Sequence, residues 1–436
     1  MESLIIWSIT AIAAIFIFLP YYLKFRRRQK EDIARHKEAE SLGITAPRAQ
    51  FPFIDVSRCI GCGSCVAACP EGDVLGVIYG KAAIINGLRC VGHGLCEKAC
   101  PVSAIKVGLG DVSTREDIPI LDEYCQSSVP GIYIVGELGG LSLIRNAITQ
   151  GRTAVERIAR DSRRSGNGDV KDLAIVGAGP AGLSAALTAV HHNLSYLVLD
   201  QQEPGGTILQ YPRRKLVMTQ PVEIPLYGQL SETEYSKETL LEIWQEIMRR
   251  FDIQVRTGVR MEKVQEENGV FNISTTDGVY KARQVVLAMG RRGTPRKLGV
   301  PGEEMSKVMY QLIDAQSYTN NRLLVVGGGD SAVEAAVGLA RQKGNQVTVS
   351  YRKPKFFRIK QKNESRINRL IAEKKVRPLF NSEVLEIRKD SVKIRLEEEI
   401  REIPNDYVFI FAGGLPPFKL LKEMGIKFGG EMRAPG

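Results

Sequence analysis

The sequence predicts a multidomain chain with three kinds of structure: an N-terminal membrane-spanning helix, a small cysteine-rich α+β domain, and a larger α/β part. Three observations support this fold class. An uncharged run opens the chain, seven of its eight cysteines lie between Cys59 and Cys100, and two apolar strands run into glycine-rich loops at Gly177 and Gly327. With 436 residues the chain is too long for one ordinary core, so several domains are expected.

The chain is basic, with 60 Lys and Arg against 49 Asp and Glu and a formal net charge of +11. Ten of these cations are concentrated in two runs, Arg26 to Lys30 and Tyr351 to Lys362. Charge runs are usually solvated faces, and no zinc-finger, RNA-recognition or helix-turn-helix signature accompanies them. We therefore expect no nucleic-acid partner.

The N-terminal run from Ser3 to Leu23 carries no charge. A helix of this length spans about 30 Å of hydrocarbon, and Trp7 and Tyr21–Tyr22 lie where interfacial aromatic residues belong. The positive charges follow the run, whereas a cleaved signal peptide places them before it. The sequence thus predicts a single-pass anchor in the inner (cytoplasmic) membrane that contacts lipid, with the N-terminus outside and the remaining domains in the cytoplasm.

The first cysteine run reads C-x2-C-x2-C-x3-C-P and contains Cys59, Cys62, Cys65 and Cys69. This spacing is typical of bacterial ferredoxins, in which three cysteines bind one [4Fe–4S] cluster and the fourth binds the other. A zinc site would more often use two separated C-x2-C knuckles. Small residues between the cysteines allow the backbone to wrap around a cluster.

The second run, from Cys90 to Pro101, keeps the outer spacing with Cys96 and Cys100 but has His93 where the middle cysteine should be. The crossed pattern assigns Cys59, Cys62, Cys65 and Cys100 to cluster one, and Cys69, Cys90 and Cys96 to cluster two. Either His93 is the fourth ligand of cluster two, or that cluster is [3Fe–4S], or His93 merely faces solvent. Residues 51 to about 108 resemble a dicluster ferredoxin that departs from the pattern at His93.

The first glycine-rich unit begins at Lys171. An apolar strand enters the loop formed by Gly177, Gly179, Pro180, Ala181 and Gly182, and an Ala-rich helix and a second strand follow. Such a loop brings a pyrophosphate close to a helix N-terminus, and the acid ending the second strand, Asp200, is placed to accept from a ribose hydroxyl. The order of elements predicts a Rossmann-like dinucleotide site.

A second unit of this kind begins at Arg322, with Gly327, Gly329, Asp330 and Ser331 in its loop. Its second strand ends not in an acid but in cations, Arg352 and Lys353, with Arg358 following. Cations at this position suit a 2′-phosphate, so NADPH is favoured over NADH. The alternative is that these residues are only exposed charges.

The two units together resemble the pyridine-nucleotide flavin reductases of the thioredoxin-reductase type, including bacillithiol-disulfide-reductase-like and ferredoxin–NADP reductase members. The resemblance covers about 171 to 428. It implies FAD at the first unit, NADPH at the second, and FAD contacts from Gly205, Gly206 and Gly290. Thioredoxin reductases hold a redox-active C-x-x-C in the nucleotide domain, which this chain lacks there; after Cys100 it has only Cys125, for which a packing role is favoured. We therefore expect no catalytic side chain beyond the cofactor chemistry.

The flavin-closing segment typical of these reductases is absent after Phe418, but Asp117 to Ile158 matches it. We infer a permutation in which 132–135 adds a strand to the first unit, Gly136 and Glu137 approach the FAD, and the helix over 141–158 points its N-terminus at the flavin. Glu137 stands where the family usually has Asp.

The expected domain boundaries follow from these elements. They are an anchor at 1–24, a charged spacer at 25–50, a dicluster ferredoxin at 51–110, a permuted flavin-site segment at 111–159, a linker at 160–170, an FAD-binding domain at 171–295, an NAD(P)H-binding domain at 296–405, and a return to the FAD domain at 406–436.

The order of carriers suggests an NAD(P)H-dependent FAD and iron–sulfur oxidoreductase that passes electrons between NADPH, FAD and two clusters. The expected partner is a quinone, a cytochrome or a ferredoxin-type protein at the membrane, and the resemblance implies a homodimer. Two alternatives remain: a disulfide reductase with ferredoxin input, and a non-catalytic electron-transfer or redox-sensing subunit.

Overall fold

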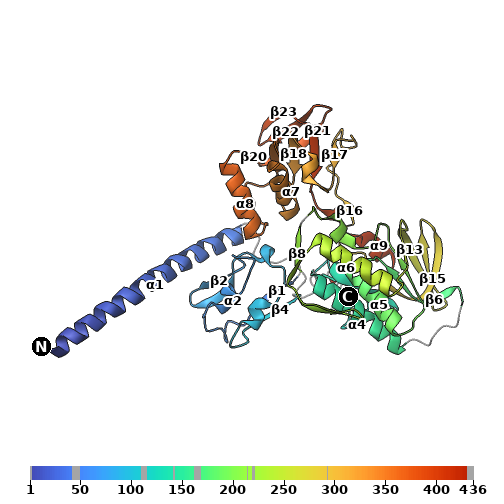
Figure 1. Cartoon of the computed structure of the whole chain (residues 1–436), viewed down its shortest axis with the longest axis horizontal. Helices are drawn as coiled ribbons and strands as arrows, with labels where there is room; N and C mark the ends of the chain where they lie inside the picture. The colour runs from blue at the N-terminus through green and yellow to red at the C-terminus, as the bar shows by residue number, and fades with distance from the viewer. Residues whose placement is uncertain are drawn as a thin grey trace, which may run out of the picture. The chain divides into compact units, whose positions relative to one another are not determined.

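The structure of the chain is a computed structural model. It describes residues 2–41, 50–109, 115–140, 143–161, 168–213, 215–218, 221–291 and 293–429. The chain divides into two compact units, Met1–Gly110 and Asp111–Gly436, which we call the cysteine-rich unit and the two-lobed unit (Figure 1). Parts of the expected spacer (42–49) and of the expected linker (162–167) lie outside the described residues.

The first element, α1 (Glu2–Ser41), corrects the sequence analysis. It is one continuous helix that includes Pro20 and joins the apolar run to the charged segment expected to be a separate spacer. Within the described part of the chain, no helix has both the length and the apolar character that crossing a membrane requires. The transmembrane anchor is therefore not supported, and the predicted location in the inner membrane is wrong.

The C-terminal half of α1 packs on the cysteine-rich unit. Asp32 is buried and accepts from the Val77 backbone N–H at 3.2 Å, and a Cβ added at Gly76 would lie 2.7 Å from its carboxylate. Arg35 forms an ion pair with Asp73, and His36 Nδ1 lies 2.9 Å from the Ile84 carbonyl oxygen. This half of the helix is thus part of the domain that it was expected only to tether.

The rest of the cysteine-rich unit is a small α+β fold. A two-stranded antiparallel sheet joins its first and last strands, and a β-hairpin and two one-turn helices lie between them. The elements in order are β1 (Gln50–Ile54), α2 (Ser64–Ala67), β2 (Leu75–Ile78), β3 (Lys81–Ile84), η1 (Gly87–Arg89), α3 (Leu95–Lys98) and β4 (Ile105–Leu109). Three cysteines belong to its buried core, which consists of Cys59, Cys65, Val74, Leu75, Ala82, Cys96, Ala104 and Ile105. A domain this small has few other side chains with which to build a core.

The first lobe of the two-lobed unit is built on a seven-stranded sheet of order β12-β7-β6-β15-β14-β13, with β5 also paired to β15. Its strands are β5 (Ile132–Ile134), β6 (Val170–Val176), β7 (Tyr196–Leu199), β12 (Val255–Arg256), β13 (Met261–Glu267), β14 (Val270–Thr275) and β15 (Gly278–Leu287). Alternate residues of β6 point into two separate cores: Leu173 and Ile175 into one, Ala174 and Val176 into the other. Both faces of the sheet are therefore covered, as the apolar run of β6 requires.

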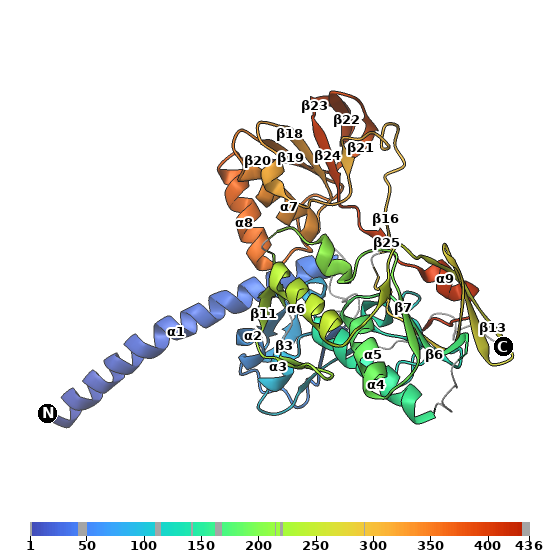
Figure 2. The same cartoon turned by 45° about the vertical axis from the view of Figure 1, so that its right-hand side comes forward.

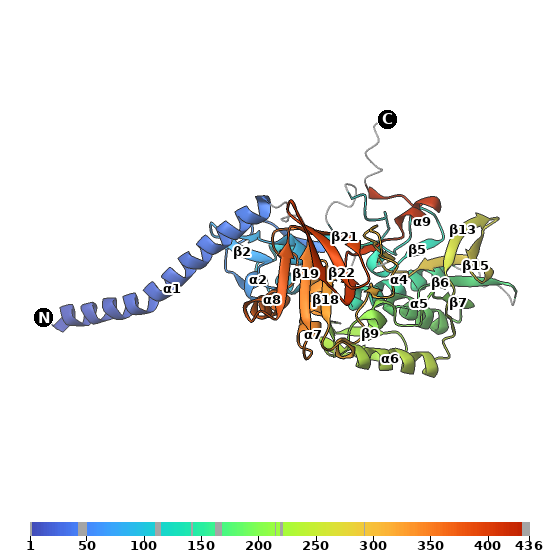
Figure 3. The ribbon, with the colours of Figure 1, turned by 90° about the horizontal axis from the view of Figure 1, so that it is seen from above.

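Helices and short strands complete this lobe. On one face α4 and α5 pack side by side, and α6 lies over the same core (Figures 1 and 3). These elements are η3 (Gly136–Gly139), α4 (Ile144–Asp161), α5 (Pro180–His191), η4 (Gly206–Gln210), β8 (Leu216–Met218), β9 (Val222–Ile224), β10 (Gly228–Leu230), β11 (Glu234–Ser236) and α6 (Lys237–Arg250). The helix expected over 141–158 is α4; it begins at Ile144 and extends to Asp161, into the expected linker.

The upstream segment is joined to the first lobe as the permutation predicts. Strand β5 pairs in parallel with β15, with Ile132 opposite Val285 and Ile134 opposite Leu287. The far end of the chain closes over the same segment, because the Ile120 N–H donates to the Lys427 carbonyl oxygen at 2.9 Å. Residues far apart in sequence thus complete one sheet and its cover.

The second lobe has a five-stranded parallel sheet of order β17-β24-β18-β19-β20, with α7 and α8 packed beside it (Figure 2). Its elements are β17 (Val308–Met309), η5 (Ala315–Ser317), β18 (Arg322–Val326), α7 (Asp330–Ala340), β19 (Gln346–Tyr351), α8 (Gln361–Ala372), β20 (Val376–Phe380) and β24 (Tyr407–Ile410). A three-stranded antiparallel sheet of β21 (Ser382–Ile387), β22 (Ser391–Leu396) and β23 (Glu399–Pro404) covers the other side.

The return to the first lobe starts later than expected. Strand β24 pairs with both β17 and β18, so 407–410, which follows the expected boundary at 406, belongs to the sheet of the second lobe. The connection follows in β25 (Gly414–Leu415), which pairs with β16 (Thr294–Pro295), and in α9 (Phe418–Glu423). An apolar strand that ends in a glycine-rich turn carries no sequence signal of which sheet it will join.

Candidate functional site

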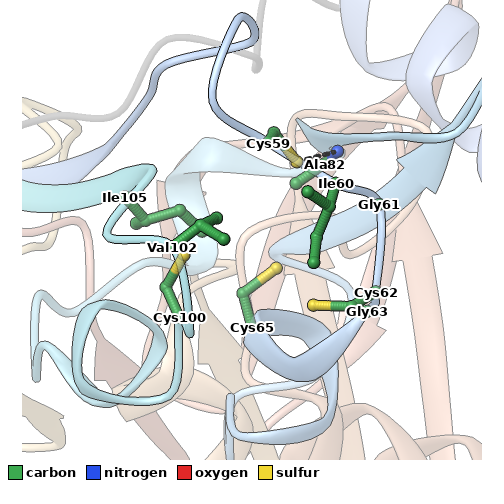
Figure 4. Close-up of a pocket in the computed structure, with 10 residues that line it drawn as sticks. All are labelled: Cys59, Ile60, Gly61, Cys62, Gly63, Cys65, Ala82, Cys100, Val102 and Ile105. Carbon is green, nitrogen blue, oxygen red and sulfur yellow. Dashed lines mark hydrogen bonds between the residues drawn. The ribbon is translucent and has the colours of Figure 1, made fainter.

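Four cysteines of the cysteine-rich unit line one pocket. Cys59, Cys62, Cys65 and Cys100 surround it together with apolar side chains such as Val102 and Ile105. Figure 4 shows their sulfurs turned toward the same space. These are the four residues that the crossed pattern assigns to cluster one, so the fold brings Cys100 to the first cysteine run as the spacing predicts.

Backbone N–H groups point at these sulfurs. Ala82 N lies 3.3 Å from Cys59 Sγ, and Ala104 N lies 3.2 Å from Cys100 Sγ. The turn between the first two cysteines needs glycine at Gly61, where φ is +70° and a Cβ would lie 2.0 Å from the Gly80 carbonyl oxygen. The Lys81 ammonium also binds the Cys59 carbonyl oxygen at 2.6 Å, which ties the hairpin to the cysteine loop.

The pocket fits an iron–sulfur cluster better than a single ion. Among the described residues, no three Cys, His, Asp or Glu side chains lie close enough together to hold one metal ion. A cluster carries its own sulfides between the irons and so takes cysteines that stand further apart. Burial raises the pKa of the Cys65 thiol to about 11, whereas the Ser64 hydroxyl beside Cys62 lowers the pKa of that thiol. Without a bound cation, deprotonation of the Cys65 thiol is therefore unfavourable.

The remaining three cysteines form a second group beside Glu71, whose Oε1 lies 3.8 Å from His93 Nε2. Burial raises the pKa of Cys69, and raises the pKa values of Cys90 and Cys96 to about 11. The carboxylate of Glu71 raises the pKa values of Cys69 and Cys90 further, which places its charge near both sulfurs. Sequence reasoning missed Glu71, although an acid directly after a Cys-Pro pair was visible.

In the first lobe, the predicted dinucleotide loop adopts the geometry that its glycines suggested. At Gly177 φ is +108° and a Cβ would lie 2.4 Å from the Ala288 carbonyl oxygen; at Gly182 it would lie 1.8 Å from the Gly177 carbonyl oxygen. Gly179 has open space around it, because a Cβ added there would lie 3.8 Å from its nearest neighbour, the Gly206 Cα. The loop is therefore packed from behind and open in front of the α5 N-terminus, where a phosphate would approach.

Asp200 and the second glycine pair converge on this loop. Asp200 Oδ2 accepts from Ala178 N at 2.6 Å and Oδ1 from Gln202 N at 2.8 Å, and burial raises the pKa of its carboxyl group. The Gly205 N–H donates to the Ala178 carbonyl oxygen at 2.9 Å, and Gly206 lies against Gly179. Gly290, at φ +65°, has open space where its side chain would be.

The permuted segment reaches the same loop through Gly136. A Cβ at Gly136 would lie 3.3 Å from the Ala181 side chain, and the Gly136 N–H donates to Gln150 Oε1 at 2.8 Å. Glu137, the next residue, is exposed. Sequence reasoning missed Gln150, because one polar residue on an amphipathic helix is usually interpreted as facing solvent.

In the second lobe, the loop before α7 is built in the same way. Gly327 has φ +139°, and a Cβ there would lie 2.5 Å from the Phe411 carbonyl oxygen, whereas Gly329 has nothing near its Cβ position. Asp330 Oδ1 accepts from Lys360 N at 2.9 Å and from Asn363 Nδ2 at 2.7 Å, so it anchors the basic loop to the helix start. Ser331 is exposed in the first turn of α7.

The predicted cations follow β19 directly. Arg352 and Lys353 are exposed, while Arg358 is half-buried and its Nε has no hydrogen-bond partner among the described residues. The buried Tyr351 stacks on Phe356 at 5.9 Å between ring centroids, which fixes the turn that carries the cations. The structure thus presents two exposed cations and one buried guanidinium nitrogen at the end of the second nucleotide strand.

Cys125 is enclosed in the core of the first lobe. It is buried in the core between the sheet and α4, at φ +66°, and burial raises the pKa of its thiol to about 12. Its carbonyl oxygen accepts from Ile134 N at 2.8 Å, so its backbone helps to position β5. A neutral, enclosed thiol is a poor nucleophile.

Comparison with known proteins agrees with both units. The profile of the pyridine nucleotide-disulphide oxidoreductase family matches residues 174–434, and that of the 4Fe-4S dicluster domain matches 51–101. A ferredoxin–NADP reductase of Ignicoccus hospitalis is 30% identical over 271 residues, 60% of this chain and 83% of that protein. The bacilliredoxin reductase Bdr of Bacillus subtilis is 28% identical, over 60% of this chain and 82% of its own length.

A solved structure agrees as well. The bacillithiol disulfide reductase of Bacillus cereus superposes with a TM-score of 0.54 at 29% identity, covering 59% of this chain and 82% of that one. Fold and loops together define an oxidoreductase with two dinucleotide-binding lobes and a 4Fe-4S domain. The chain belongs to the pyridine nucleotide-disulphide oxidoreductase family, and it is an enzyme of the NAD(P)H-dependent flavin and iron–sulfur type.

Proposed function

We propose that this enzyme passes electrons between NADPH in its second lobe, FAD in its first lobe, and two iron–sulfur clusters in its cysteine-rich unit. When bound, FAD supplies the exchange between a two-electron hydride donor and one-electron carriers. One observation carries the proposal: seven of the eight cysteines lie in the cysteine-rich unit, and the one cysteine of the two-lobed unit, Cys125, is buried with a pKa of about 12. The chain therefore offers ligands for clusters that can accept electrons, and it offers no dithiol as an electron acceptor.

In the first lobe, the residues of the chain bind and orient the FAD. The open face at Gly179 admits the pyrophosphate to the α5 N-terminus, and Gly205 and Gly206 hold the loop from the other side. Asp200 keeps the loop in place through Ala178 and has lone pairs left for a ribose hydroxyl. Gln150 fixes Gly136 beside the same helix start.

In the second lobe, Gly327 and Gly329 shape the phosphate loop, and Arg352, Lys353 and Arg358 supply positive charge for a 2′-phosphate. The unpartnered Nε of Arg358 supports this role, because a buried guanidinium N–H without an acceptor is costly unless a ligand supplies one. NADPH is accordingly the proposed donor.

The acceptor is proposed to be an electron-carrying protein. A relative is named for transferring electrons between ferredoxin and NADP, and this chain carries its own ferredoxin-like domain at 51–101. We infer that the cysteine-rich unit takes the place of a separate ferredoxin and that cluster one, whose ligand Cys62 is exposed, exchanges electrons with the next carrier. The pathway then ends at an exposed cluster instead of at a disulfide.

The test is an anaerobic titration of the reconstituted full chain with NADPH and with NADH, followed by optical and EPR spectroscopy. Bleaching of flavin and then of cluster absorbance by NADPH is the expected result. Absence of flavin reduction by either nucleotide would instead leave a non-catalytic electron-transfer subunit. Arg352→Ser with Lys353→Ser should raise the NADPH concentration needed by about tenfold to a hundredfold, the value of one or two charge-assisted hydrogen bonds.

Two controls sharpen this test. Lys343→Ser removes an exposed cation outside the nucleotide loop and should leave the NADPH titration unchanged. NADH reduction should be equally insensitive to the Arg352 and Lys353 substitutions. Cys125→Ser should retain full reduction of flavin and clusters. Loss of turnover in this variant would favour disulfide reduction, the activity named for the bacillithiol disulfide reductase of Bacillus cereus.

A further inference from the structure

The second cysteine group has a buried histidine in place of its fourth cysteine. Two clusters of the [4Fe–4S] type take eight protein ligands, and the cysteine-rich unit offers seven cysteines. We propose that His93 is the eighth ligand and that Glu71 is the positioning residue that holds its ring. This inference rests on the proposed presence of two clusters and specifies the chemistry of the second.

The burial of His93 is the first observation. Its side chain is 5% exposed, and its Nε2 has no hydrogen-bond partner among the described residues. A polar nitrogen enclosed in this way loses its water without gaining a partner, which native proteins avoid. The histidine therefore does not face solvent, and its Nε2 needs an acceptor inside the fold, which leaves Nδ1 as the ring nitrogen that can bind a metal ion.

The backbone around His93 is the second, independent observation. In site one, Cys62 stands between Gly61 at φ +70° and Gly63 at φ +75°. In site two, His93 stands between Gly92 at φ +75° and Gly94 at φ +74°. The main chain thus makes the same left-handed turn on both sides of the two residues, a conformation that side chains other than glycine rarely adopt.

The helices that follow extend this likeness. Gly63 is the N-cap of α2, with ψ 1°, and Gly94 is the N-cap of α3, with ψ 8°; Cys65 and Cys96 are the second residues of these helices. His93 consequently has the backbone position in site two that a cysteine ligand has in site one. A histidine chosen only to fill a core would not need two flanking glycines in left-handed geometry.

Glu71 is placed to act on the ring. Its Oε1 is 3.8 Å from His93 Nε2, and both side chains are about equally buried, at 5% exposure for His93 and 6% for Glu71. Histidines that bind metals commonly donate the N–H of the ring nitrogen that does not bind the metal to a carboxylate, which fixes ring orientation and tautomer. With the Nε2–H donated to Glu71, Nδ1 is the nitrogen that binds iron. At 3.8 Å the contact is longer than a hydrogen bond, so it closes only with a small movement of the ring.

The test is spectroscopic and does not depend on NADPH. The full chain is reconstituted anaerobically with ⁵⁷Fe and sulfide, carries ¹⁵N-histidine, and is reduced with dithionite. Pulsed EPR should show a ¹⁵N coupling of ligand strength on one cluster, and this coupling should vanish in His93→Cys, whose iron content stays at that of the wild type. His36→Ala removes another partly buried histidine of the same unit and should keep the coupling.

Further variants separate the roles. His93→Ala should lose iron selectively from one cluster, with Mössbauer spectra showing a three-iron species beside an intact four-iron one. His93→Cys should shift the midpoint potential of that cluster downward, because a neutral imidazole is replaced by an anionic thiolate. Glu71→Gln should keep the ¹⁵N coupling but change its size, as a positioning residue would.

Three results would overturn the inference. The first is wild-type protein without a histidine nitrogen coupling although both clusters are present. The second is loss of one iron in Glu71→Gln but not in His93→Ala, which would make the carboxylate the ligand. The third is a three-iron cluster already in the wild type. Clusters that form as expected but are not reduced by NADPH would contradict the proposed function alone, whereas failure of both clusters to form would overturn both.

Discussion

At the scale of single residues, the glycines of the first nucleotide loop serve two separable purposes. Gly182 packs against the loop, since a Cβ there would lie 1.8 Å from the Gly177 carbonyl oxygen. Gly179 has ordinary backbone angles, with φ −77°, and a Cβ added there would lie 3.8 Å from its nearest protein neighbour, the Gly206 Cα. One glycine is therefore required by the fold and the other by the ligand.

This difference predicts opposite behaviour of two alanine variants. Gly182→Ala should lower the stability of the FAD-free protein by about 1–3 kcal/mol, the usual cost of overpacking a core. Gly179→Ala should leave that stability unchanged but weaken FAD binding, because the added methyl group occupies the side where the pyrophosphate approaches. Thermal unfolding without FAD and a flavin titration measure the two effects, and a stability loss in Gly179→Ala would contradict this division.

Cys125 yields a second prediction at this scale. With a pKa of about 12, only about one Cys125 in ten thousand is a thiolate at pH 8, and the side chain is buried as well. Iodoacetamide should therefore alkylate Cys125 at least about a hundredfold more slowly in the folded chain than in urea. Peptide mapping by mass spectrometry separates this residue from the cluster cysteines. Rapid labelling of the folded chain would show an accessible, reactive thiol and revive the disulfide alternative.

At the scale of elements, α1 shows how a sequence pattern can mislead. The apolar run and the charges after it satisfied the rules for an anchor, yet those rules depend only on local composition. The contacts that attach the helix to the rest of the cysteine-rich unit are long-range: Asp32 to Val77 and Arg35 to Asp73. Nothing in the local pattern around Asp32 or Arg35 indicated that this half of the helix would pack on a hairpin about forty residues further along the chain.

Elsewhere, a prediction succeeded where it depended on a local sequence pattern and failed where it depended on long-range contacts. Cysteine spacing and glycine loops are local, so the grouping of Cys59, Cys62, Cys65 and Cys100 and the turn at Gly177 followed from the sequence. The β5–β15 pairing also could be predicted, because the segment at 117–158 matched a known closing piece. It was not possible to predict the roles of Glu71 and Gln150 or the sheet that β24 joins. Each depends on which distant part of the chain packs against that residue or strand.

The docking of α1 predicts an unusual pH dependence. Burial raises the pKa of Asp32, offset in part by its hydrogen bond to Val77 and by Arg28 and Arg35. At pH values between the ordinary pKa of Asp32 in the undocked helix and its raised pKa in the docked helix, the docked state binds more protons than the undocked state. Docking should therefore be strongest at low pH and weaken as pH rises through the raised pKa.

Asp32→Asn should remove this weakening, because the amide oxygen still accepts from Val77 without a buried charge. Hydrogen exchange of the 75–84 hairpin, measured in the full chain, should show greater protection than in the wild type at neutral pH and a smaller difference near pH 4. Glu31→Gln alters an exposed carboxylate on the same helix and serves as the control. Lower protection in Asp32→Asn at neutral pH would mean that the charge itself holds the helix.

At the scale of the whole molecule, the two nucleotide lobes must bring their ligands together for hydride transfer. Two ion pairs between described side chains link the lobes: Lys215 Nζ lies 2.7 Å from Glu334 Oε2, and Arg213 lies 3.4 Å from Asp314. Glu334 lies on α7, which begins at the nucleotide loop, and also accepts from Asn363 Nδ2. The Lys215–Glu334 pair thus connects the first lobe directly to the helix proposed to receive the NADPH phosphates.

The exposure of this pair sets its strength. Both side chains are about one-quarter exposed, and pairs with this degree of solvent contact contribute at most about 1 kcal/mol. That is less than a tenfold bias between two arrangements of the lobes, so the pair favours the observed arrangement without locking it.

A double-mutant cycle of Lys215→Met and Glu334→Gln should give a coupling energy between the two side chains of about 0.5–1 kcal/mol. Fluorescence energy transfer between labels on the two lobes should shift by a correspondingly small fraction in each single variant. A coupling above about 2 kcal/mol, together with a large change in energy transfer, would show instead that this contact holds the lobes fixed and must break before the nicotinamide reaches the flavin.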